Sequence, residues 1–404
     1  MANPVRLQKG NVEIADILRE YLPLFLKTHK VHSHQFKVLN SIINCRTARL
    51  GAHIDKCDQC QYLEISYNSC RDRHCPKCHG SKQSKWLGNQ IKQLLPVPYF
   101  HTVFTLPHHL NNLFICNQKI LYDHFFKTAV SILNQFAADL KYFGGKIGHI
   151  GILHTWGQNL GYHVHLHFIV TGGAISKDET RWVQKKHNGK YLFPIKAMQK
   201  AFRSQFIAKV VKLHDNGKLS YPGELSNLKH PVYFEDFKAK LYKLPWVIYA
   251  KKPFAGPEQV IEYIGRYTHR IAISNQRIMS ASAKEITFKY KDYRDNSKTK
   301  IMKLSPIEFI RRYLQHILPF RFVKIRHGGF HAGGYKKRLL ALASFLIRKI
   351  NKDFEASKKK MVKVSKQIMQ KSTISCPACF TGTLKLQKTL TPQLLELIEQ
   401  MQPL

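Results

Sequence analysis

The stretch HVHLHFIV, residues 163–170, places a histidine at every second position and then continues into apolar residues. Successive side chains of a β-strand point to opposite faces of the sheet, so His163, His165 and His167 share one face and the alternating apolar residues share the other. Two imidazoles at positions i and i+2 can hold one divalent ion and leave positions open for water or a substrate oxygen. Histidines on a sheet face can equally be structural, so this pattern needs support from elsewhere in the chain.

A metal held by two histidines usually needs a third ligand, and the residues before this strand offer one. Residues 147–156 also read as a strand, and a GQNLG turn joins them to the histidine strand. Gln158 lies in that turn, where a hairpin would bring its side chain back towards the metal. We therefore expect Gln158 to be a polar candidate for the third ligand.

The remaining periodicities predict an α+β fold around a mainly antiparallel sheet, because the chain lacks the regular β–α alternation of a doubly wound fold. Helical spacing predicts helices within 11–50, 112–141 and 195–213, and alternation predicts strands at 98–106, 245–250 and 270–274 and a strand–turn–strand unit at 284–304. We found no internal repeat.

A pair of tyrosines forms the second motif, Tyr263-x3-Tyr267. The surrounding segment has Pro and acidic residues at its start and basic residues at its end, which predicts a helix over 257–270. Four residues' separation puts both phenols on one helix face. Tyrosines usually serve packing, but Arg266 and Arg270 nearby favour contact with phosphate. A phenol with a pKa of ~10 becomes a useful nucleophile when a metal polarises the phosphodiester.

Four cysteines form two CxxC hooks, Cys57-x2-Cys60 and Cys75-x2-Cys78, which are 14 residues apart. This spacing predicts one four-cysteine structural zinc site, since a short polar segment cannot build a core and the metal would supply its folding energy. The alternative is a set of buried cysteines without metal. Four further side chains could complete a second site or replace one of these ligands: His53, Cys70, His74 and His79.

A third hook, CPAC at residues 376–379, lies far from the others in the sequence. A lone hook needs partners, and no second pair follows it. It could be half of a degenerate zinc ribbon or a plain loop, and the sequence does not decide between them.

Charge sets the expected partner. The chain has 65 Lys plus Arg against 25 Asp plus Glu, a net charge of +40, and residues 321–371 hold 15 basic residues against two acidic ones. Such an excess predicts a nucleic acid as the partner. A membrane surface is the alternative, but no basic amphipathic anchor stands out, and no apolar run approaches the length of a membrane span. With no signal-peptide pattern at the start, we expect a cytoplasmic, nucleoid-associated protein.

Several motifs in the same order resemble a known family. The chain resembles the rolling-circle insertion-sequence transposases of the IS91 type, within the HUH endonuclease group. The resemblance extends from about residue 57 to 330 and is carried by four segments: YNSCRDRHCPKCHGSKQSKWL, LHTWGQNLGYHVHLHFIVTGG, YIGRYTHRIAISNQRI and FIRRYLQHILPFRFVKIRHGGF.

The resemblance implies a metal site on the histidine strand. His165 and His167 would be the metal pair, and His163 is a further candidate because the HVHLH run departs from the family's HPHLH pattern only at Val164. Gln158 would be the polar candidate for a third ligand. The implied ion is Mg²⁺ or Mn²⁺, and the implied fold is an antiparallel sheet with the histidines on a central strand and the tyrosine helix laid across it.

The resemblance also implies the chemistry. Tyr263 and Tyr267 would be paired nucleophiles that cut single-stranded DNA and form a 5′-phosphotyrosine intermediate, and Arg266 and Arg270 would contact the DNA. We expect a DNA transposase with four parts: 1–50 helical, 51–95 zinc-binding, 96–330 catalytic and 331–404 a basic tail. The alternatives are a plasmid replication initiator or relaxase of the same HUH type, or a non-catalytic zinc-dependent DNA-binding regulator.

Overall fold

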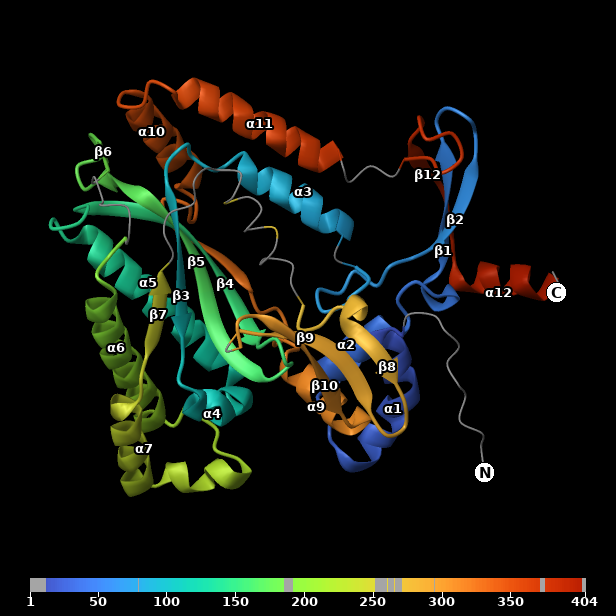
Figure 1. Ribbon diagram of the computed structural model, residues 1–404, viewed down its shortest axis with the longest axis horizontal. Helices are drawn as coiled ribbons and strands as arrows, with labels where there is room; N and C mark the ends of the chain where they lie inside the picture. Colours follow the sequence, from blue (N-terminus) through green and yellow to red (C-terminus); the bar gives the residue numbers. More distant parts are fainter. Residues whose placement is uncertain are drawn as a thin grey trace.

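The structure is a computed structural model that describes residues 12–78, 80–184, 192–250, 260, 265, 271–293, 295–370 and 375–401. Figure 1 shows the arrangement of its elements. The helices are α1 (Ile14–Thr28), α2 (Ser33–Ile43), α3 (Gly80–Ile91), α4 (Asn111–Cys116), α5 (Gln118–Ala138), α6 (Ile195–Asp215), α7 (Pro231–Lys243), α9 (Pro306–Gln315), α10 (Lys336–Arg348), α11 (Phe354–Gln370) and α12 (Pro392–Met401). The strands are β1 (Ala52–Cys57), β2 (Leu63–Tyr67), β3 (Tyr99–Thr105), β4 (Gly145–Trp156), β5 (Tyr162–Ser176), β6 (Trp182–Val183), β7 (Val247–Ala250), β8 (Ile278–Ala281), β9 (Ile286–Asp292), β10 (Lys298–Leu304), β11 (Ile325–Gly329) and β12 (Leu384–Leu390).

The histidine strand β5 lies in the middle of the main sheet. Within the described residues this sheet has six strands in the order β11-β4-β5-β3-β7, with β6 paired to β5, and every pairing is antiparallel. The predicted hairpin is present as β4 and β5, which are joined by a short turn. The α+β prediction with antiparallel sheets is therefore confirmed.

The two faces of the main sheet differ in what covers them. Leu166 and Phe168 of β5 and Phe104 of β3 lie in a large buried cluster with side chains of α5 and α6. Phe202 of α6 meets Phe104 edge to face, with ring centroids 5.1 Å apart. On the opposite face, Ile169 lies in a second cluster with residues of α3, α10 and α11, and α3 and α11 run side by side in Figure 1. The continuous apolar run at the end of HVHLHFIV thus matches a strand segment with both faces covered.

The N-terminal helices pack against a later part of the chain. Ile17 and Phe25 of α1 are buried in a cluster that also holds Phe288 of β9 and Phe309 of α9. The second sheet, β10-β9-β8, belongs to the same region, below and to the right of the main sheet in Figure 1. The helices expected within residues 11–50 are present, but these contacts cross the predicted boundary at residue 50. The four-part division of the chain stays a prediction.

The strand predicted at 270–274 is wrong for the part that the structure describes. Residues 271–274 form no strand, and the short 3-10 helix η4 (Asn275–Arg277) follows them. Ala272 and Ile273 are buried in the cluster around α1 and α9. Their apolar character is explained by this packing, because a short apolar run does not by itself distinguish a strand from other buried segments.

The third sheet joins the two ends of the chain. Its order is β12-β1-β2, and β12 pairs with β1 from Ala52 opposite Leu390 to Cys57 opposite Leu384. The predicted basic tail, 331–404, therefore contains α10, α11, β12 and α12 and contributes a strand to the N-terminal sheet (Figure 1). None of the helices in the described part of the chain has the length and apolar character needed to span a membrane.

Candidate active site and metal centres

Three histidines converge on the face of the main sheet opposite α5 and α6. His165 and His167 lie on β5, and His154 on β4 is directly opposite His165 in the strand register. Each histidine offers one ring nitrogen, and these three nitrogen atoms all lie within 4.8 Å of one another. His154 and His167 are buried, and His165 is partly buried. Register between the two strands therefore brings a third imidazole to the predicted pair.

Hydrogen bonds orient two of these rings. Nδ1 of His165 lies 2.9 Å from the carbonyl oxygen of His163, so Nδ1–H donates and the lone pair is on Nε2. Nδ1 of His167 lies 3.0 Å from Nε2 of His101, a buried residue on β3. If His167 donates in that pair, its Nε2 also carries a lone pair. Metal-binding histidines in proteins commonly have this arrangement, with the second nitrogen donating to a fixed acceptor.

Electrostatics favour the neutral form of the central ring. Burial lowers the pKa of His165 to about 3, and the neighbouring His163 contributes in the same direction. A neutral imidazole is the form that binds a metal ion. The donor set of three imidazoles therefore fits a divalent ion, and it suits Mn²⁺ or another transition metal better than Mg²⁺, which prefers oxygen ligands.

The predicted additional ligands Gln158 and His163 are not in the three-histidine group, although the His163 ring lies beside that of His165 with centroids 5.0 Å apart, and their role as ligands stays a prediction. The amide Nε2 of Gln158 donates to the hydroxyl of Tyr293 at 3.3 Å, and Arg277 donates to the Gln158 carbonyl. The His163 side chain is exposed near the hairpin turn and does not belong to the three-histidine group. The turn directs Gln158 towards β9. His154, four residues earlier, lies opposite His165 because β4 and β5 pair in that register.

The tyrosine motif lies outside the described residues. Tyr263 and Tyr267 are not among them, and neither are the predicted DNA contacts Arg266 and Arg270. Two described residues flank the first tyrosine: Val260 and Gly265, which are both helical and buried. Val260 belongs to the cluster that contains Ile150 of β4 and Ile169 of β5, on the same sheet face as the histidines.

A cleft beside the β4–β5 hairpin combines basic and aromatic side chains. It has a volume of about 610 Å³, and its lining includes Trp156, Arg277, Lys289, Tyr290 and Tyr293. A second hollow of about 450 Å³ continues from Tyr290 and Tyr293 to His163. Basic side chains beside aromatic rings are the usual composition of a surface that binds single-stranded nucleic acid.

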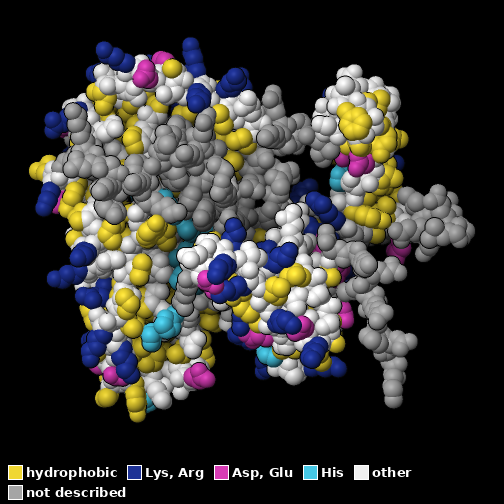
Figure 2. All heavy atoms as spheres, in the orientation of Figure 1, with side chains coloured by type: hydrophobic (Ala, Val, Ile, Leu, Met, Phe, Trp, Pro, Cys, Tyr) yellow, Lys and Arg dark blue, Asp and Glu magenta, His cyan; other side chains and the backbone are white. Residues whose placement is uncertain are grey.

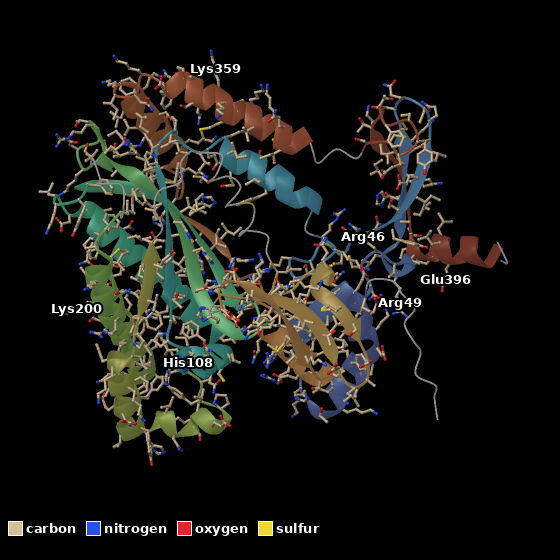
Figure 3. All side chains as sticks on the ribbon, viewed as in Figure 1. Arg46, Arg49, His108, Lys200, Lys359 and Glu396 are labelled. Carbon is tan, nitrogen blue, oxygen red and sulfur yellow. The ribbon has the colours of Figure 1, made fainter. Side chains whose placement is uncertain are left out.

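Basic side chains are also spread over the rest of the surface. Figure 2 shows Lys and Arg side chains at many places along the upper and left edges of the main body and over the part to its lower right. Figure 3 places Lys359 on α11 and Arg46 and Arg49 near the base of the third sheet, well apart from Lys359. An anionic partner can therefore contact more than one region of the protein.

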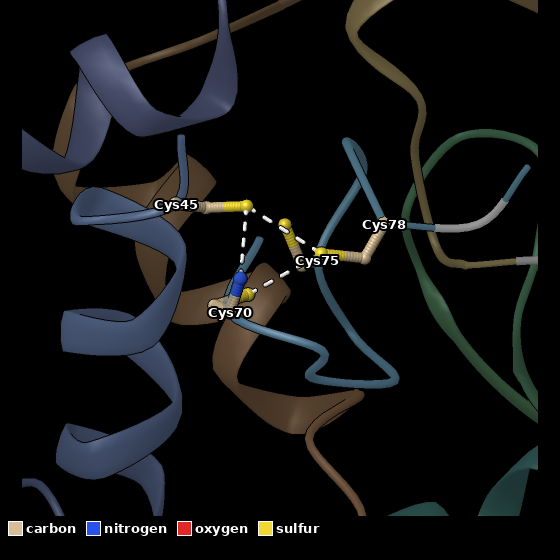
Figure 4. A group of neighbouring side chains, drawn as sticks. All are labelled: Cys45, Cys70, Cys75 and Cys78. Atoms are coloured by element: carbon tan, nitrogen blue, oxygen red, sulfur yellow. Dashed lines mark hydrogen bonds between the residues drawn. The ribbon is translucent and has the colours of Figure 1, made fainter. Parts of the chain in front are cut away.

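The first cysteine group lies at the base of the β1–β2 hairpin. Cys45 follows α2, and Cys70, Cys75 and Cys78 lie in the loop after β2 (Figure 4). Sγ of Cys78 is 3.4 Å from Sγ of Cys45 and 3.5 Å from Sγ of Cys70. The loop is held by His74, whose Nε2 accepts from the Leu318 amide at 3.1 Å.

The second cysteine group lies at the tip of the same hairpin. Cys57 is the last residue of β1 and Cys60 lies in the turn to β2, and Cys376 and Cys379 of the CPAC hook lie against them. All nine cysteines are in the described residues, and none is in a disulfide. Eight of them form the two groups, and Cys116 belongs to neither.

The predicted ligand set of Cys57, Cys60, Cys75 and Cys78 is therefore corrected. The two hooks lie at opposite ends of the hairpin, because β2 carries the chain away from the first hook before the second begins. Cys57 and Cys60 lie with Cys376 and Cys379, whereas Cys75 and Cys78 lie with Cys45 and Cys70. Of the surplus candidates, Cys70 is in the first group, His53 bonds Asn68 at 2.9 Å, His74 is a loop contact, and His79 lies outside the described residues. Sequence reasoning missed Cys45, His101 and His154, which no CxxC or HxH pattern marks.

Comparison with known proteins agrees with this architecture. The family model "Putative transposase" matches residues 148–338, which include the histidine strand, and the model "Transposase zinc-binding domain" of the IS91 type matches residues 17–106. No solved structure matches the chain.

Two curated relatives cover most of the chain. A "Putative transposase y4qJ" from Sinorhizobium fredii is 39% identical over 93% of this chain and 95% of its own length. The "Transposase for insertion sequence element IS801" from Pseudomonas savastanoi pv. phaseolicola is 27% identical over 74% of this chain and 70% of its own length. The chain therefore belongs to the IS91-type transposases and has their N-terminal zinc-binding domain.

Proposed function

We propose that this transposase cuts and rejoins single-stranded DNA by HUH chemistry, with His154, His165 and His167 as the metal ligands and Tyr263 and Tyr267 as the nucleophiles. One observation carries the proposal: three imidazoles from two adjacent strands converge on one face of the main sheet. Three converging imidazoles are unusual in a structural role and usual in a metal site.

The histidines supply an ordered donor set. The hydrogen bond from His165 to the His163 carbonyl and the contact between His167 and His101 orient the two rings, and with His167 as the donor to His101 both Nε2 atoms would carry the lone pair that binds a metal. A Mn²⁺ or Mg²⁺ ion bound there would polarise a phosphodiester oxygen of the DNA. The preference of imidazole for softer ions favours Mn²⁺.

The tyrosines complete the reaction. The phenolic oxygen of one tyrosine forms a bond to phosphorus as the bond from phosphorus to the 3′ oxygen breaks. The phenol gives up its proton, and the departing 3′ oxygen takes one up, so the products are a 5′-phosphotyrosine and a free 3′-OH. The ester retains the bond energy, so rejoining needs no nucleotide cofactor. A second tyrosine can hold a second strand before the first is resolved.

The cleft beside the hairpin is the proposed path of the DNA strand. Lys289 and Arg277 would contact phosphates, and Tyr290 and Tyr293 offer rings on which bases can stack. The cleft leads to His163 at the edge of the histidine group. Arg266 and Arg270 next to the tyrosines would add phosphate contacts, and the substrate would be element ends and target DNA in the nucleoid.

The experiment is metal-dependent nicking of a single-stranded oligonucleotide from the element end. His154→Ala should abolish nicking as fully as His165→Ala and His167→Ala, and Gln158→Ala should leave it largely intact, because Gln158 contacts Tyr293 rather than the histidines. DNA binding should survive all four changes, since most affinity comes from phosphate contacts. Nicking that survives His154→Ala but not Gln158→Ala would reject this ligand set.

The nucleophile is tested by the covalent adduct. Phenylalanine at 263 or 267 removes one hydroxyl and little volume. The double variant Tyr263→Phe, Tyr267→Phe should form no adduct that is stable to boiling in detergent. An adduct that persists would move the nucleophile elsewhere, with Tyr290 and Tyr293 in the adjacent cleft as the next candidates. DNA binding without any cutting under any metal would instead support a non-catalytic regulator.

A further inference from the structure

We propose that Cys57, Cys60, Cys376 and Cys379 bind a second structural zinc ion, which fastens the C-terminal segment to the N-terminal hairpin. The zinc-binding family match ends at residue 106 and does not include the CPAC hook. This site is separate from the first cysteine group and does not depend on the nicking chemistry proposed above.

The distances between sulfur atoms fit a tetrahedral metal site. Sγ of Cys57 is 3.7 Å from Sγ of Cys379, and Sγ of Cys60 is 3.6 Å from Sγ of Cys376. Tetrahedral zinc with Zn–S bonds of about 2.3 Å separates its sulfur ligands by about 3.8 Å. A disulfide would require about 2.0 Å, so these contacts are not bonded pairs.

Backbone amides surround the sulfur atoms in the way that a metal hook requires. The amide of Gln59 donates to Sγ of Cys57 at 3.4 Å, and the amide of Ala378 donates to Sγ of Cys376 at 3.4 Å. In each hook the donor is two residues after the cysteine, so both hooks have the same local turn. Such N–H···S bonds favour the thiolate, which is the form that binds zinc.

Gly382 allows the two hooks to approach each other. Its amide donates to Sγ of Cys379 at 3.2 Å. A Cβ atom at this position would collide with Sγ of Cys57 and would crowd the side chain of Gln59. The backbone of the C-terminal hook therefore sits directly against a sulfur atom of the N-terminal hook, which no side chain at 382 would permit.

The sheet around the site has too little apolar core to hold this contact by itself. β12 adds to β1, and the amide of Thr383 donates to Oδ1 of Asp58 at 2.8 Å beside the hooks. The buried apolar cluster at this sheet, within the described part of the chain, consists of Ala52 and Leu390 of the sheet and Leu395 of α12. Where a segment has so few buried residues, metal binding supplies its folding free energy.

The test counts zinc in the purified full chain. The background variant carries His165→Ala and His167→Ala, so that zinc on the histidines does not contribute. We expect two zinc ions per chain in this background and one after Cys376→Ser with Cys379→Ser. Cys116→Ser is the matched control, because Cys116 is an exposed cysteine outside both groups, and it should leave the count at two. An unchanged count after the double cysteine change would overturn the proposal.

Two further measurements separate the loss of a ligand from the loss of folding. Cys379→His retains a zinc donor atom and should keep the second ion, whereas Cys379→Ala should lose it. Hydrogen exchange should show faster exchange of amides in β12 and β1 after Cys376→Ser with Cys379→Ser, and unchanged protection in β4 and β5. Unchanged protection in β12 would show that zinc does not hold this strand and would also reject the proposal.

Discussion

The histidine group and the cysteine groups are both clusters of metal donors, but the structure holds them in place by different means. His154, His165 and His167 stand on adjacent strands of the main sheet, whose opposite face is buried against α5 and α6. Cys57, Cys60, Cys376 and Cys379 stand on turns and loops at a three-stranded sheet that buries few apolar side chains, whereas the first cysteine group packs against the buried cluster of α1 and α9. Figure 2 shows this contrast in the exposed apolar side chains of the smaller sheet.

This difference indicates which part of the protein needs a metal ion in order to fold. Donors on a sheet with a large core keep their positions whether or not an ion is bound, so the ion can serve chemistry and exchange with solvent. Donors on loops without a core are brought together by the ion itself. The histidine group is therefore predicted to be a catalytic site that is formed before an ion binds. The cysteine group at the hairpin tip is predicted to need its ion in order to fold.

Removal of metal should give the largest effect. A strong chelator should increase the exchange rate of amides in β1, β2 and β12 by a factor of about 10³ or more, because zinc binding supplies of order 10 kcal/mol to such modules. Amides of β4 and β5 should keep their protection. Equal loss of protection in both regions, measured by hydrogen exchange with mass spectrometry, would break the comparison.

A cavity in the main core should give the next largest effect. Phe168 is fully buried between Phe104 and Phe126, and Phe168→Ala should lower the free energy of unfolding by about 3–5 kcal/mol. Phe380→Ala in the third sheet region is the matched control, because that ring is 80% exposed, and it should change stability by less than about 0.5 kcal/mol. Denaturant unfolding of both variants measures the difference.

Acid should weaken the main body to a smaller extent. Burial lowers the pKa of His149 and of His316 to about 4. Between this value and the ordinary pKa of about 6.5, the unfolded chain binds a proton that the folded chain does not, so stability falls as the pH is lowered through this window. Each buried histidine should cost about 2 kcal/mol at pH 5 relative to pH 8.

The variant His316→Gln tests this assignment. Nε2 of His316 lies 3.2 Å from the carbonyl oxygen of Leu160, a contact that a glutamine amide can replace in part. The pH dependence of the unfolding free energy should become shallower in the variant by the contribution of one histidine. A dependence as steep as that of the wild-type protein would place the acid sensitivity elsewhere.

Surface changes on the small sheet should have the smallest effect. Ile65 of β2 is 64% exposed, and Ile65→Thr keeps a β-branched side chain in the strand. We expect a change of less than about 0.5 kcal/mol in stability and no loss of zinc. A large loss would mean that this face is packed against another part of the protein in solution, and the two regions would then differ less in their buried apolar contacts.

The sequence predicted the parts of this protein that depend on local pattern. The alternation of HVHLHFIV correctly identified β5 and its two faces, and the preceding segment was correctly assigned as its hairpin partner. Charge and the CxxC hooks indicated a nucleic-acid partner and zinc binding, and the family assignment agrees with both.

The sequence could not predict which residues meet across strands and chain ends. His154 joins the histidine group because of the register between β4 and β5, including an irregularity just after it, and one residue of shift would turn it to the other face. Gln158 was the nearer candidate by sequence, but the turn directs it towards Tyr293. The partners of Cys75 and Cys78 depend on the direction of β2, and the partners of Cys57 and Cys60 lie more than 300 residues later in the chain.

The pairing of β12 with β1 has a consequence for how the protein is made. A ribosome releases the hairpin long before the CPAC hook, since Cys60 and Cys376 are 316 residues apart. Cys57 and Cys60 at the hairpin tip therefore remain without Cys376 and Cys379 while the main sheet folds. A product of interrupted translation would retain the histidine group but lack the strand that closes the zinc module. Closure of this module thus marks a chain that has been translated past β12.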